Sequence, residues 1–228
     1  NCANSEKWDN IITVKESNGN IHDTQAYKHG WFMAQDPGGI AISKLLSPNP
    51  GQLVIDLCSA PGGKTCHMAE LMENKGRILA WDIHPHRLAL VEANCRRMGV
   101  NNVKVRQHRA EVFDDTLSAV ADRVLADVPC SGLGIIRRKP EIKLNRTLDD
   151  ITALTGLQRK IINTAGRYLK PGGVLVYSTC TINKQENEDI VLDFLKDNND
   201  FELGEMVQLF PHIDGTDGFF MAKLIRKG

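Results

Sequence analysis

The amino-acid sequence predicts an α/β fold, with a parallel sheet covered by helices on both faces. From residue 53 onward, short apolar runs typical of buried strands alternate with amphipathic stretches typical of helices. Turns rich in glycine or proline separate several of these segments. A strand followed by a helix and another strand places the two strands parallel in one sheet. The length of 228 residues suits one such domain with a sizeable core.

The alternation divides the chain into ten expected elements. Along the first half we expect a strand at 53–57, a helix at 64–75, a strand at 77–82, a helix at 85–98 and a strand at 103–105. Along the second half we expect a strand at 122–127, a helix at 151–169, a strand at 173–178, a helix at 186–196 and a closing strand that includes 218–225. The Lys-Pro-Gly-Gly sequence at 170–173 is expected to end the long helix.

Two regions lie outside this alternation. Residues 1–50 are polar, with a turn signal at 18–20 and a helical stretch at 40–46, and we expect them to form an N-terminal extension or cap on a domain at 51–228. Residues 130–150 form a loop rich in glycine, arginine and lysine. Because ligands bind beyond the carboxyl ends of parallel strands, this loop is a candidate functional segment.

Composition excludes several functional classes. The formal net charge is zero, whereas a domain that holds nucleic acid by bulk charge is strongly basic. The six cysteines contain no CxxC pair, which argues against both a zinc site and a secreted disulfide framework. We therefore expect no metal and a reducing, cytoplasmic compartment. No apolar run approaches the length of a membrane span, so we expect no membrane contact.

The first motif is DLCSAPGGKT at 56–65, a strand that enters a glycine-rich turn and then a helix. Such a turn leaves main-chain N–H groups free to bind a ligand. A phosphate-binding P-loop would need glycine at Cys58, and the dinucleotide fingerprint G-x-G-x-x-G is absent. The turn therefore favours a nucleotide-like ligand bound without a phosphate contact.

An acidic residue, Asp82, ends the second expected strand, a position suited to accepting hydrogen bonds from two ribose hydroxyls. The other interpretation is a turn or helix-capping residue, because His84 and Pro85 follow. The capping role is the better interpretation of Asp82 alone. Together with the glycine-rich turn, ribose binding becomes the better one.

Two further motifs end the fourth and fifth expected strands: DVPCSG, with Asp127 and Cys130, and YSTCT, with Cys180. Neighbouring strand ends lie about 5 Å apart, so these three side chains are expected to meet at one edge of the sheet. A cysteine in apolar surroundings is more often a small buried residue than a nucleophile. We apply that interpretation to Cys58, Cys66 and Cys95, and we expect chemistry from Cys130 and Cys180.

The strings DLCSAPGGKT, DVPCSGLGIIRRKPEIK, YSTCTINKQENE and DGFFMAKL resemble RNA 5-methylcytosine methyltransferases that use S-adenosylmethionine. The likeness is greatest to the bacterial ribosomal RNA small subunit methyltransferase B group, also called Sun or Fmu, and it extends from about Gly30 to the end. It implies the Rossmann-like class I S-adenosylmethionine-dependent methyltransferase sheet with a final antiparallel strand.

The resemblance also implies residue roles. Asp82 would hold the ribose, Asp127 would lie between cofactor and cytosine, Cys180 would be the nucleophile, and Cys130 would assist product release. The methionine part of the cofactor would be bound by the turn residues Cys58, Ser59, Ala60, Pro61, Gly62, Gly63 and Lys64. One position departs from the pattern, because Arg109 stands where the family usually has an aspartate that contacts adenine. Either Glu111 or a main-chain carbonyl replaces that contact, or cofactor affinity is altered.

This chemistry explains the need for a cysteine in a positive environment. Cytosine C5 is a poor nucleophile until a thiolate adds to C6, and a free thiol with a pKa of about 8.5 is mostly protonated at neutral pH. Lys64 and the basic residues at 137–139 are candidate sources of positive potential. The target base must also be unpaired or flipped out. The basic residues of the 130–150 loop are candidate phosphate contacts, with a solvated charged surface as an equally weighted interpretation.

The implied function is methyl transfer from S-adenosylmethionine to C5 of an RNA cytosine through a covalent adduct between Cys180 and C6. The resemblance points to 16S rRNA as partner, at a site of the cytosine 967 type. Alternatives are another rRNA or tRNA cytosine, a DNA cytosine or adenine methyltransferase, and a catalytically weak RNA-binding scaffold. Members of the resembled group carry an N-terminal helical RNA-binding domain. We therefore expect the C-terminal, monomeric catalytic part of a longer protein, which explains its neutrality.

Overall fold

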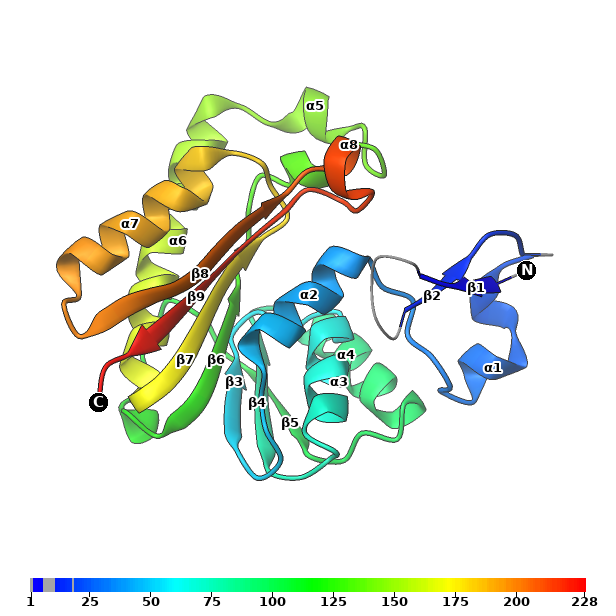
Figure 1. Ribbon diagram of the computed structural model, residues 1–228, viewed down its shortest axis with the longest axis horizontal. Coiled ribbons are helices and arrows are strands. Elements are labelled where there is room, and N and C mark those ends of the chain that lie inside the picture. The colour runs from blue at the N-terminus through cyan, green and yellow to red at the C-terminus, as the bar shows by residue number, and fades with distance from the viewer. Residues whose placement is uncertain (1, 6–10, 18) are drawn as a thin grey trace.

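The computed structural model describes residues 2–5, 11–17 and 19–228, and its main feature is a seven-stranded mixed sheet (Figure 1). The strand order is β5-β4-β3-β6-β7-β9-β8. The first five of these strands run parallel, while β9 is antiparallel to both β7 and β8. The bounds are β3 (Leu53–Asp56), β4 (Arg77–Asp82), β5 (Val103–Gln107), β6 (Ala121–Asp127), β7 (Leu169–Thr179), β8 (Phe201–Leu209) and β9 (Phe219–Arg226).

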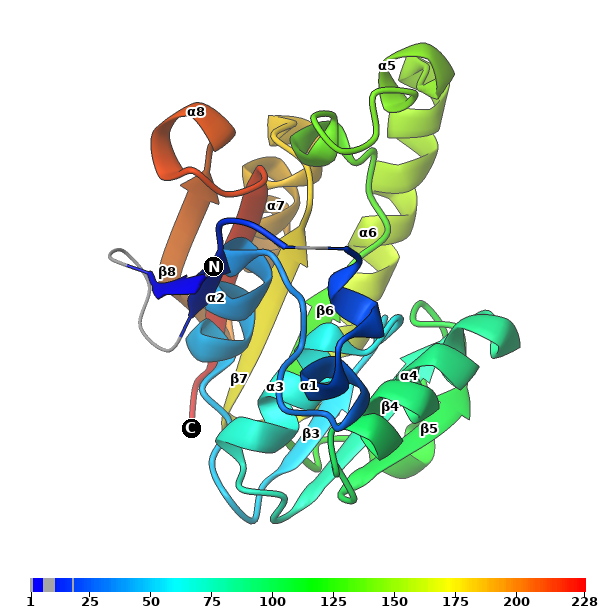
Figure 2. The same ribbon diagram turned by 90° about the vertical axis from the view of Figure 1, so that its right-hand side faces the viewer.

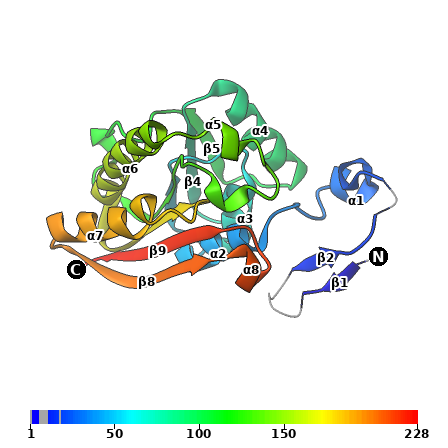
Figure 3. The ribbon, with the colours of Figure 1, turned by 90° about the horizontal axis from the view of Figure 1, so that it is seen from above.

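Helices cover both faces of the sheet (Figure 2, Figure 3). One face carries α6 (Leu148–Tyr168) and α7 (Glu188–Asp197), whose buried residues pack with the strands in one core cluster. The other carries α2 (Pro37–Leu46), α3 (Gly63–Leu71) and α4 (Pro85–Arg97). Two short helices, α5 (Ile142–Asn145) and α8 (Pro211–Asp214), lie outside these layers. Among the described residues, no helix is both long and apolar enough to cross a lipid bilayer.

The predicted α/β fold with a final antiparallel strand is confirmed. Each of the ten expected elements is present, with bounds that shift by a few residues. The Lys-Pro-Gly-Gly sequence at 170–173 lies within a strand and does not itself end the long helix. The long helix ends at Tyr168, and residues 170–173 form a bulge inside β7, because its pairing with β6 passes from Leu169 directly to Val174. Gly172, with φ of 76°, allows the chain to turn there.

Strand β8 was not predicted from the sequence. Its segment, FELGEMVQL, alternates apolar and polar residues only at its two ends, because a shift of register between Leu203 and Glu205 interrupts the pattern. Pairing with β9 from Phe201 to Leu209 holds it in the sheet.

The first 50 residues divide into two parts. A hairpin of β1 (Cys2–Asn4) and β2 (Ile12–Val14) and the short α1 (Gln25–Lys28) project from the sheet (Figure 3). Helix α2, in contrast, buries Ile42 and Leu46 in the core against the sheet, as a part of the α/β domain. The turn expected at 18–20 includes residue 18, which lies outside the described residues.

Arg97 of α4 holds the segment after α1 on the domain. Its guanidinium donates to the carbonyl oxygens of Tyr27 (2.9 Å) and Phe32 (3.0 Å) and stacks 3.8 Å from the Tyr27 ring. Gly30, with φ of 74°, approaches the Arg97 main chain so closely that a Cβ there would lie 1.8 Å from the Arg97 oxygen. The segment is therefore fixed by specific contacts.

Replacing Arg97 by alanine is expected to lower the free energy of unfolding by about 1–3 kcal/mol, because two partly buried carbonyls lose their donor. Urea unfolding followed by circular dichroism measures the change. The matched control is Arg96→Ala, since Arg96 is the exposed neighbour on the same helix. Equal stability of the two variants would contradict the anchoring role.

The order of the strands in the sheet indicates where a ligand would bind. Strand order reverses between β3 and β6, which are adjacent in the sheet although 64 residues lie between the end of β3 at Asp56 and the start of β6 at Ala121. In open α/β sheets, ligands bind beyond the carboxyl ends of the strands at this reversal. The glycine-rich turn follows β3 and Asp127 ends β6, so both predicted motifs lie at the reversal point.

Candidate active site

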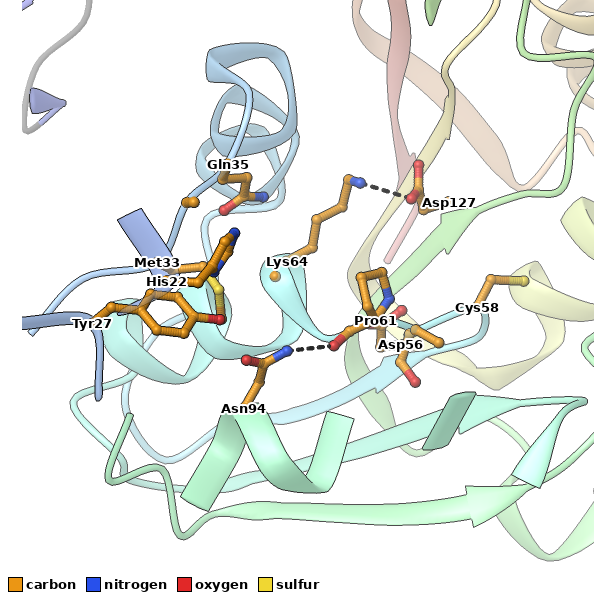
Figure 4. Close-up of a pocket in the computed structure, with 14 residues that line it drawn as sticks. His22, Tyr27, Met33, Gln35, Asp56, Cys58, Pro61, Lys64, Asn94 and Asp127 are labelled. Carbon is orange, nitrogen blue, oxygen red and sulfur yellow. Dashed lines mark hydrogen bonds and ion pairs between the residues drawn. The ribbon is translucent and has the colours of Figure 1, made fainter. Parts of the chain in front are cut away.

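The turn after β3 is a compact main-chain structure. Ser59 donates to the Trp81 carbonyl from both its N–H (2.7 Å) and its Oγ (2.9 Å), and the Gly62 N–H donates to the Ser59 carbonyl (2.8 Å). Gly62 has φ of 104°, and a Cβ there would lie 3.1 Å from the Val91 Cα on α4. Asn94 of α4 donates to the Pro61 carbonyl (2.9 Å, Figure 4). Glycine is thus required at 62 for both the turn and the close approach of α4.

Beside this turn lies a cleft of about 280 Å³ (Figure 4). Of the residues predicted to bind cofactor, it is lined by Cys58, Ser59, Ala60, Pro61, Gly63, Lys64 and Asp127. Its other walls are Asp56, Asn94 and five residues of the N-terminal segment, His22, Tyr27, Met33, Ala34 and Gln35. The sequence predicted an N-terminal extension or cap without identifying these residues, because long-range contacts such as those of Arg97 bring them to the cleft.

Asp56 was also missed as a site residue. It is buried, Thr65 Oγ1 donates to its Oδ2 (2.7 Å), and its Oδ1 has no hydrogen-bond partner. Burial raises the pKa of this carboxyl to about 7, only partly opposed by the Thr65 hydrogen bond. A buried carboxylate oxygen without a donor, in the wall of a cleft, is suited to a cationic ligand group.

Asp82 lies at the end of β4 but does not line the cleft. Its buried carboxylate accepts from the His84 N–H (2.9 Å) and pairs with Arg87 (3.3 Å). The turn role weighed from the sequence is therefore present. The ribose role stays a prediction, since two ribose hydroxyls would have to be accepted in addition to these contacts.

At the ends of β6 and β7, Asp127 connects the cofactor turn to the cysteines. Lys64 Nζ lies 2.8 Å from its Oδ2, and Ser178 Oγ donates to its Oδ1 (2.8 Å) (Figure 4 draws the Lys64 contact). Burial alone would lower the pKa of Lys64, but the Asp127 carboxylate more than offsets this effect and raises it. Lys64 is thus a permanent cation at the site.

The two predicted cysteines are in contact, with 3.3 Å between the Cys130 and Cys180 sulfur atoms. The Cys130 thiol, as hydrogen-bond donor, lowers the pKa of Cys180; burial and Asp127 oppose this effect, and Lys64 supports it. The same contact, together with burial, raises the pKa of Cys130 well above its usual value. The pair therefore favours a thiolate at Cys180 and a thiol at Cys130. The expected meeting of Asp127, Cys130 and Cys180 at one edge is confirmed.

Cys66 and Cys95 form a second close pair, with 3.9 Å between their sulfur atoms and a pKa of Cys95 that this contact lowers, but neither residue lines the cleft or ends a strand of the sheet. Cys66 and Cys95 are buried in the core between α3 and α4. Burial, and then the Asp56 carboxylate, raise the pKa of Cys58 well above its usual value, so this residue stays a neutral thiol. The described residues include no cluster of three or more His, Cys, Asp or Glu side chains suited to a metal ion.

Two basic residues of the 130–150 loop, Arg137 and Arg138, have carboxylate partners that the sequence analysis did not predict. Arg137 and Arg138 each pair with both Asp36 and Asp217, at distances of 2.6 to 3.5 Å, and both carboxylates are nearly buried. These guanidinium groups join the segment before α2, the loop after β6 and the loop before β9. Their charge is compensated inside the protein, so the positive potential at Cys180 comes from Lys64.

Arg109, the residue that departs from the family pattern, lies at a second hollow with Ile83, Gln107, His108 and Val112. Its guanidinium pairs with Glu111, with distances of 2.8 and 2.5 Å. The Glu111 carboxylate is therefore already engaged by Arg109. This contact favours a main-chain carbonyl over Glu111 as the replacement for the missing aspartate.

The family model described as 16S rRNA methyltransferase RsmB/F matches residues 43–225. The chain belongs to the RsmB/F family. The resemblance noted from the motifs is thereby confirmed. The family match begins within α2, in agreement with the packing of this helix on the sheet.

Curated relatives of this RsmB/F chain include two proteins with different names. It is 36% identical to the probable ribosomal RNA small subunit methyltransferase B of Bacillus subtilis, over 94% of this chain and 52% of the relative. It is 38% identical to the tRNA (cytosine(72)-C(5))-methyltransferase of Pyrococcus horikoshii, over 90% of this chain and 54% of the relative. The chain thus spans about half the length of these relatives.

A solved structure has the same architecture. The crystal structure of NSun6 from Pyrococcus horikoshii with SFG superposes with a TM-score of 0.83 and 36% sequence identity. The match covers 92% of this RsmB/F chain and 57% of that chain.

Proposed function

We propose that this RsmB/F family member transfers a methyl group from S-adenosylmethionine to C5 of a cytosine in RNA. The observation that carries the proposal is the contact between Cys130 and Cys180, 3.3 Å apart, at the end of the sheet where the Lys64–Asp127 pair borders the cleft. Two thiols with opposite pKa shifts suit a reaction that needs one nucleophile and one proton-transfer group. The names of both curated relatives support an RNA substrate.

The cleft fits the methionine part of S-adenosylmethionine. The unpaired Asp56 oxygen suits its ammonium group, and the glycine-rich turn at the start of α3 presents main-chain N–H groups to its carboxylate. The solved structure of NSun6 with SFG, an analogue of this cofactor, supports the choice of S-adenosylmethionine as the cofactor. When bound, the cofactor supplies an electrophilic methyl group. Asp82 and the hollow at Arg109 would serve its ribose and adenine.

In the proposed reaction, the Cys180 thiolate adds to C6 of the cytosine, and the electron pair displaced to C5 takes the methyl group. S-adenosylhomocysteine leaves with the electrons of the broken bond between sulfur and methyl. A base then removes the C5 proton, and the bond between Cys180 and C6 breaks to regenerate the thiolate. Cys130, which stays a thiol 3.3 Å from Cys180, would serve that release by donating a hydrogen bond to the departing Cys180 sulfur. Asp127, which accepts from Lys64 and Ser178, is placed to bind the cytosine edge.

We propose small-subunit rRNA as the substrate, on the basis of the family description and the Bacillus subtilis relative. A tRNA cytosine is the second candidate, because the Pyrococcus horikoshii relative is named for one. Both substrates require the target base to be unpaired or flipped toward the cysteines.

The test is methylation of small-subunit rRNA and of a tRNA pool by the full-length protein. Mass spectrometry of the digested RNA is expected to show 5-methylcytidine, and bisulfite sequencing locates it. Reactions without S-adenosylmethionine are the control. Methylation of tRNA alone would overturn the rRNA assignment, and a methyl group at any position other than cytosine C5 would overturn the proposed chemistry.

Cofactor affinity is expected to rise with pH between 6 and 8. With a pKa of about 7, Asp56 passes from about one tenth to about nine tenths ionised over this range, and only the carboxylate attracts an ammonium group. The dissociation constant should therefore fall by about tenfold, as measured by titration calorimetry.

The variant Asp56→Asn is the control for this pH dependence. It is expected to bind the cofactor weakly and with little change between pH 6 and 8. A pH dependence that persists in Asp56→Asn would contradict the assignment. Absence of binding by the unmodified protein at millimolar cofactor would favour the RNA-binding scaffold.

A further inference from the structure

A buried carboxylate, Glu186, is linked by hydrogen bonds to the residues that follow the two cysteines, and it has no part in the chemistry proposed above. It ends the short 3-10 helix Lys184–Glu186 after β7, and its side chain is fully buried. Four hydrogen bonds reach it, from the Ser131 N–H (2.8 Å), Ser131 Oγ (2.5 Å), Gln158 Nε2 (3.0 Å) and Asn183 Nδ2 (3.2 Å). Burial of a carboxylate costs free energy unless hydrogen-bond donors satisfy it, so these four hydrogen bonds hold Ser131, Gln158 and Asn183 in position around Glu186.

The network reaches both cysteine segments. Ser131, which donates two of the four hydrogen bonds, directly follows Cys130. Its Oγ also lies 2.9 Å from Thr181 Oγ1, and Thr181 directly follows Cys180. Glu186 therefore holds the main chain next to Cys130 directly and the residue next to Cys180 through one hydroxyl.

The adjacent residue, Asn187, makes the complementary contacts. Its Oδ1 accepts from Thr179 Oγ1 (2.6 Å) and its Nδ2 donates to the Thr181 carbonyl (3.1 Å). Thr179 and Thr181 flank Cys180 on both sides. Asn187 is thus attached to the Cys180 loop, whereas Glu186 is attached mainly to the Cys130 loop.

We propose that Glu186 is a positioning residue that fixes Cys130 against Cys180 and thereby controls release of the methylated RNA. This inference rests on the covalent mechanism proposed above. Two loops from different strands bring the sulfur atoms to 3.3 Å, and no bond joins them. Displacement of a reacting group by about 1 Å can cost about a hundredfold in rate. Loss of the Glu186 contacts should therefore slow the step that needs Cys130 more than the step that needs Cys180.

The test is Glu186→Gln in the full-length protein, supplied with S-adenosylmethionine and substrate RNA. The Ser131 N–H and Gln158 donate to Oε1, whereas Ser131 Oγ and Asn183 donate to Oε2, so an amide leaves one of these two pairs of donors without an acceptor. The expected result is a covalent adduct of protein and RNA on a denaturing gel. We also expect kcat to fall by about 10- to 100-fold, with KM for RNA within about twofold. A merely structural defect would not accumulate adduct.

Three further variants sharpen the test. Asn187→Ala should slow turnover without accumulation of adduct, because it loosens the nucleophile and thus slows adduct formation. Glu202→Gln, at an exposed position on β8, should behave as the unmodified protein. Ser131→Ala removes only the hydroxyl that joins Glu186 to Thr181, and it replaces Glu186→Gln if that variant does not fold, as judged by circular dichroism and cofactor binding.

A second measurement requires no RNA. Diamide takes one hydrogen from each thiol of a close pair and leaves a disulfide, so its rate with Cys130 and Cys180 reports how often their sulfur atoms meet. Glu186→Gln should slow this rate about tenfold or more relative to Glu202→Gln. Peptide mapping identifies the disulfide.

The outcomes separate the inference from the proposed function. Normal turnover, no adduct and an unchanged diamide rate in Glu186→Gln would overturn the positioning role, even if Cys130→Ala accumulates adduct as the mechanism requires. Product formation by Cys180→Ala would instead overturn the covalent mechanism itself. Adduct with Glu186→Gln but not with Asn187→Ala would support the inference.

Discussion

Replacement of Cys180 by alanine is expected to abolish methyl transfer to RNA, with a loss of about a thousandfold or more, the scale observed when a covalent nucleophile is removed. Without the sulfur atom, nothing adds to C6, and C5 stays too weak a nucleophile to take the methyl group. No other described cysteine combines a lowered pKa with contact to Cys130 and proximity to Lys64. Transfer of tritiated methyl from S-adenosylmethionine to RNA measures the loss.

The controls distinguish lost chemistry from lost structure. Cys180→Ala should bind S-adenosylmethionine with unchanged affinity, because the cleft residues do not include Cys180. Cys2→Ala, at an exposed cysteine in the N-terminal hairpin, should keep full activity. Full methyl transfer by Cys180→Ala would contradict the proposed mechanism.

Replacement of Cys130 by alanine is expected to have a different outcome, namely accumulation of a covalent complex between protein and RNA. Adduct formation requires only Cys180, whereas its breakdown requires loss of the C5 proton before the bond between sulfur and C6 can break. Cys130, 3.3 Å from the nucleophile, is the thiol that would donate a hydrogen bond to the departing Cys180 sulfur during that breakdown. A band of raised mass, stable to heat and detergent, should appear with Cys130→Ala, and multiple turnover should fall by about a hundredfold.

The double variant Cys130→Ala/Cys180→Ala should form no such band, which assigns the covalent bond to Cys180. The reverse pattern, with adduct in Cys180→Ala and none in Cys130→Ala, would show that the cysteine after proline is the nucleophile, as expected of a DNA cytosine methyltransferase. Absence of adduct in both single variants would remove the release role from Cys130.

The meeting of Asp127, Cys130 and Cys180 at one edge of the sheet could be predicted from the sequence, because these residues lie at or just after the ends of predicted strands. Asp127 closes β6, and Cys180 directly follows β7, its neighbour in the sheet. Parallel pairing brings strand ends to the same edge, so sequence position alone predicts their contact. The same argument succeeded for the turn from Cys58 to Lys64, which follows β3 at the reversal of strand order.

The arginine cluster could not be predicted in this way. Arg137 and Arg138 read as candidate phosphate contacts, because a sequence shows charge but not the partner of that charge. Their partners are distant in the sequence: Asp36 lies 102 residues before Arg138, and Asp217 lies 80 residues after Arg137. Only the packing of α2 and the loop before β9 brings these carboxylates to the loop after β6.

The sequence by itself determined the α/β class, the order of the strands and helices from β3 onward except β8, and the side chains at the ends of β3, β4, β6 and β7, because these depend on local periodicity and on turn residues. Tertiary structure alone decided which groups surround those side chains. Burial raises the pKa of Asp56 to about 7, because its Oδ1 has no hydrogen-bond donor. Hydrogen bonds from residues of three segments hold Glu186 next to the Cys130 loop. Such effects depend on desolvation and long-range contacts, which exist only after the sheet and its helices have packed.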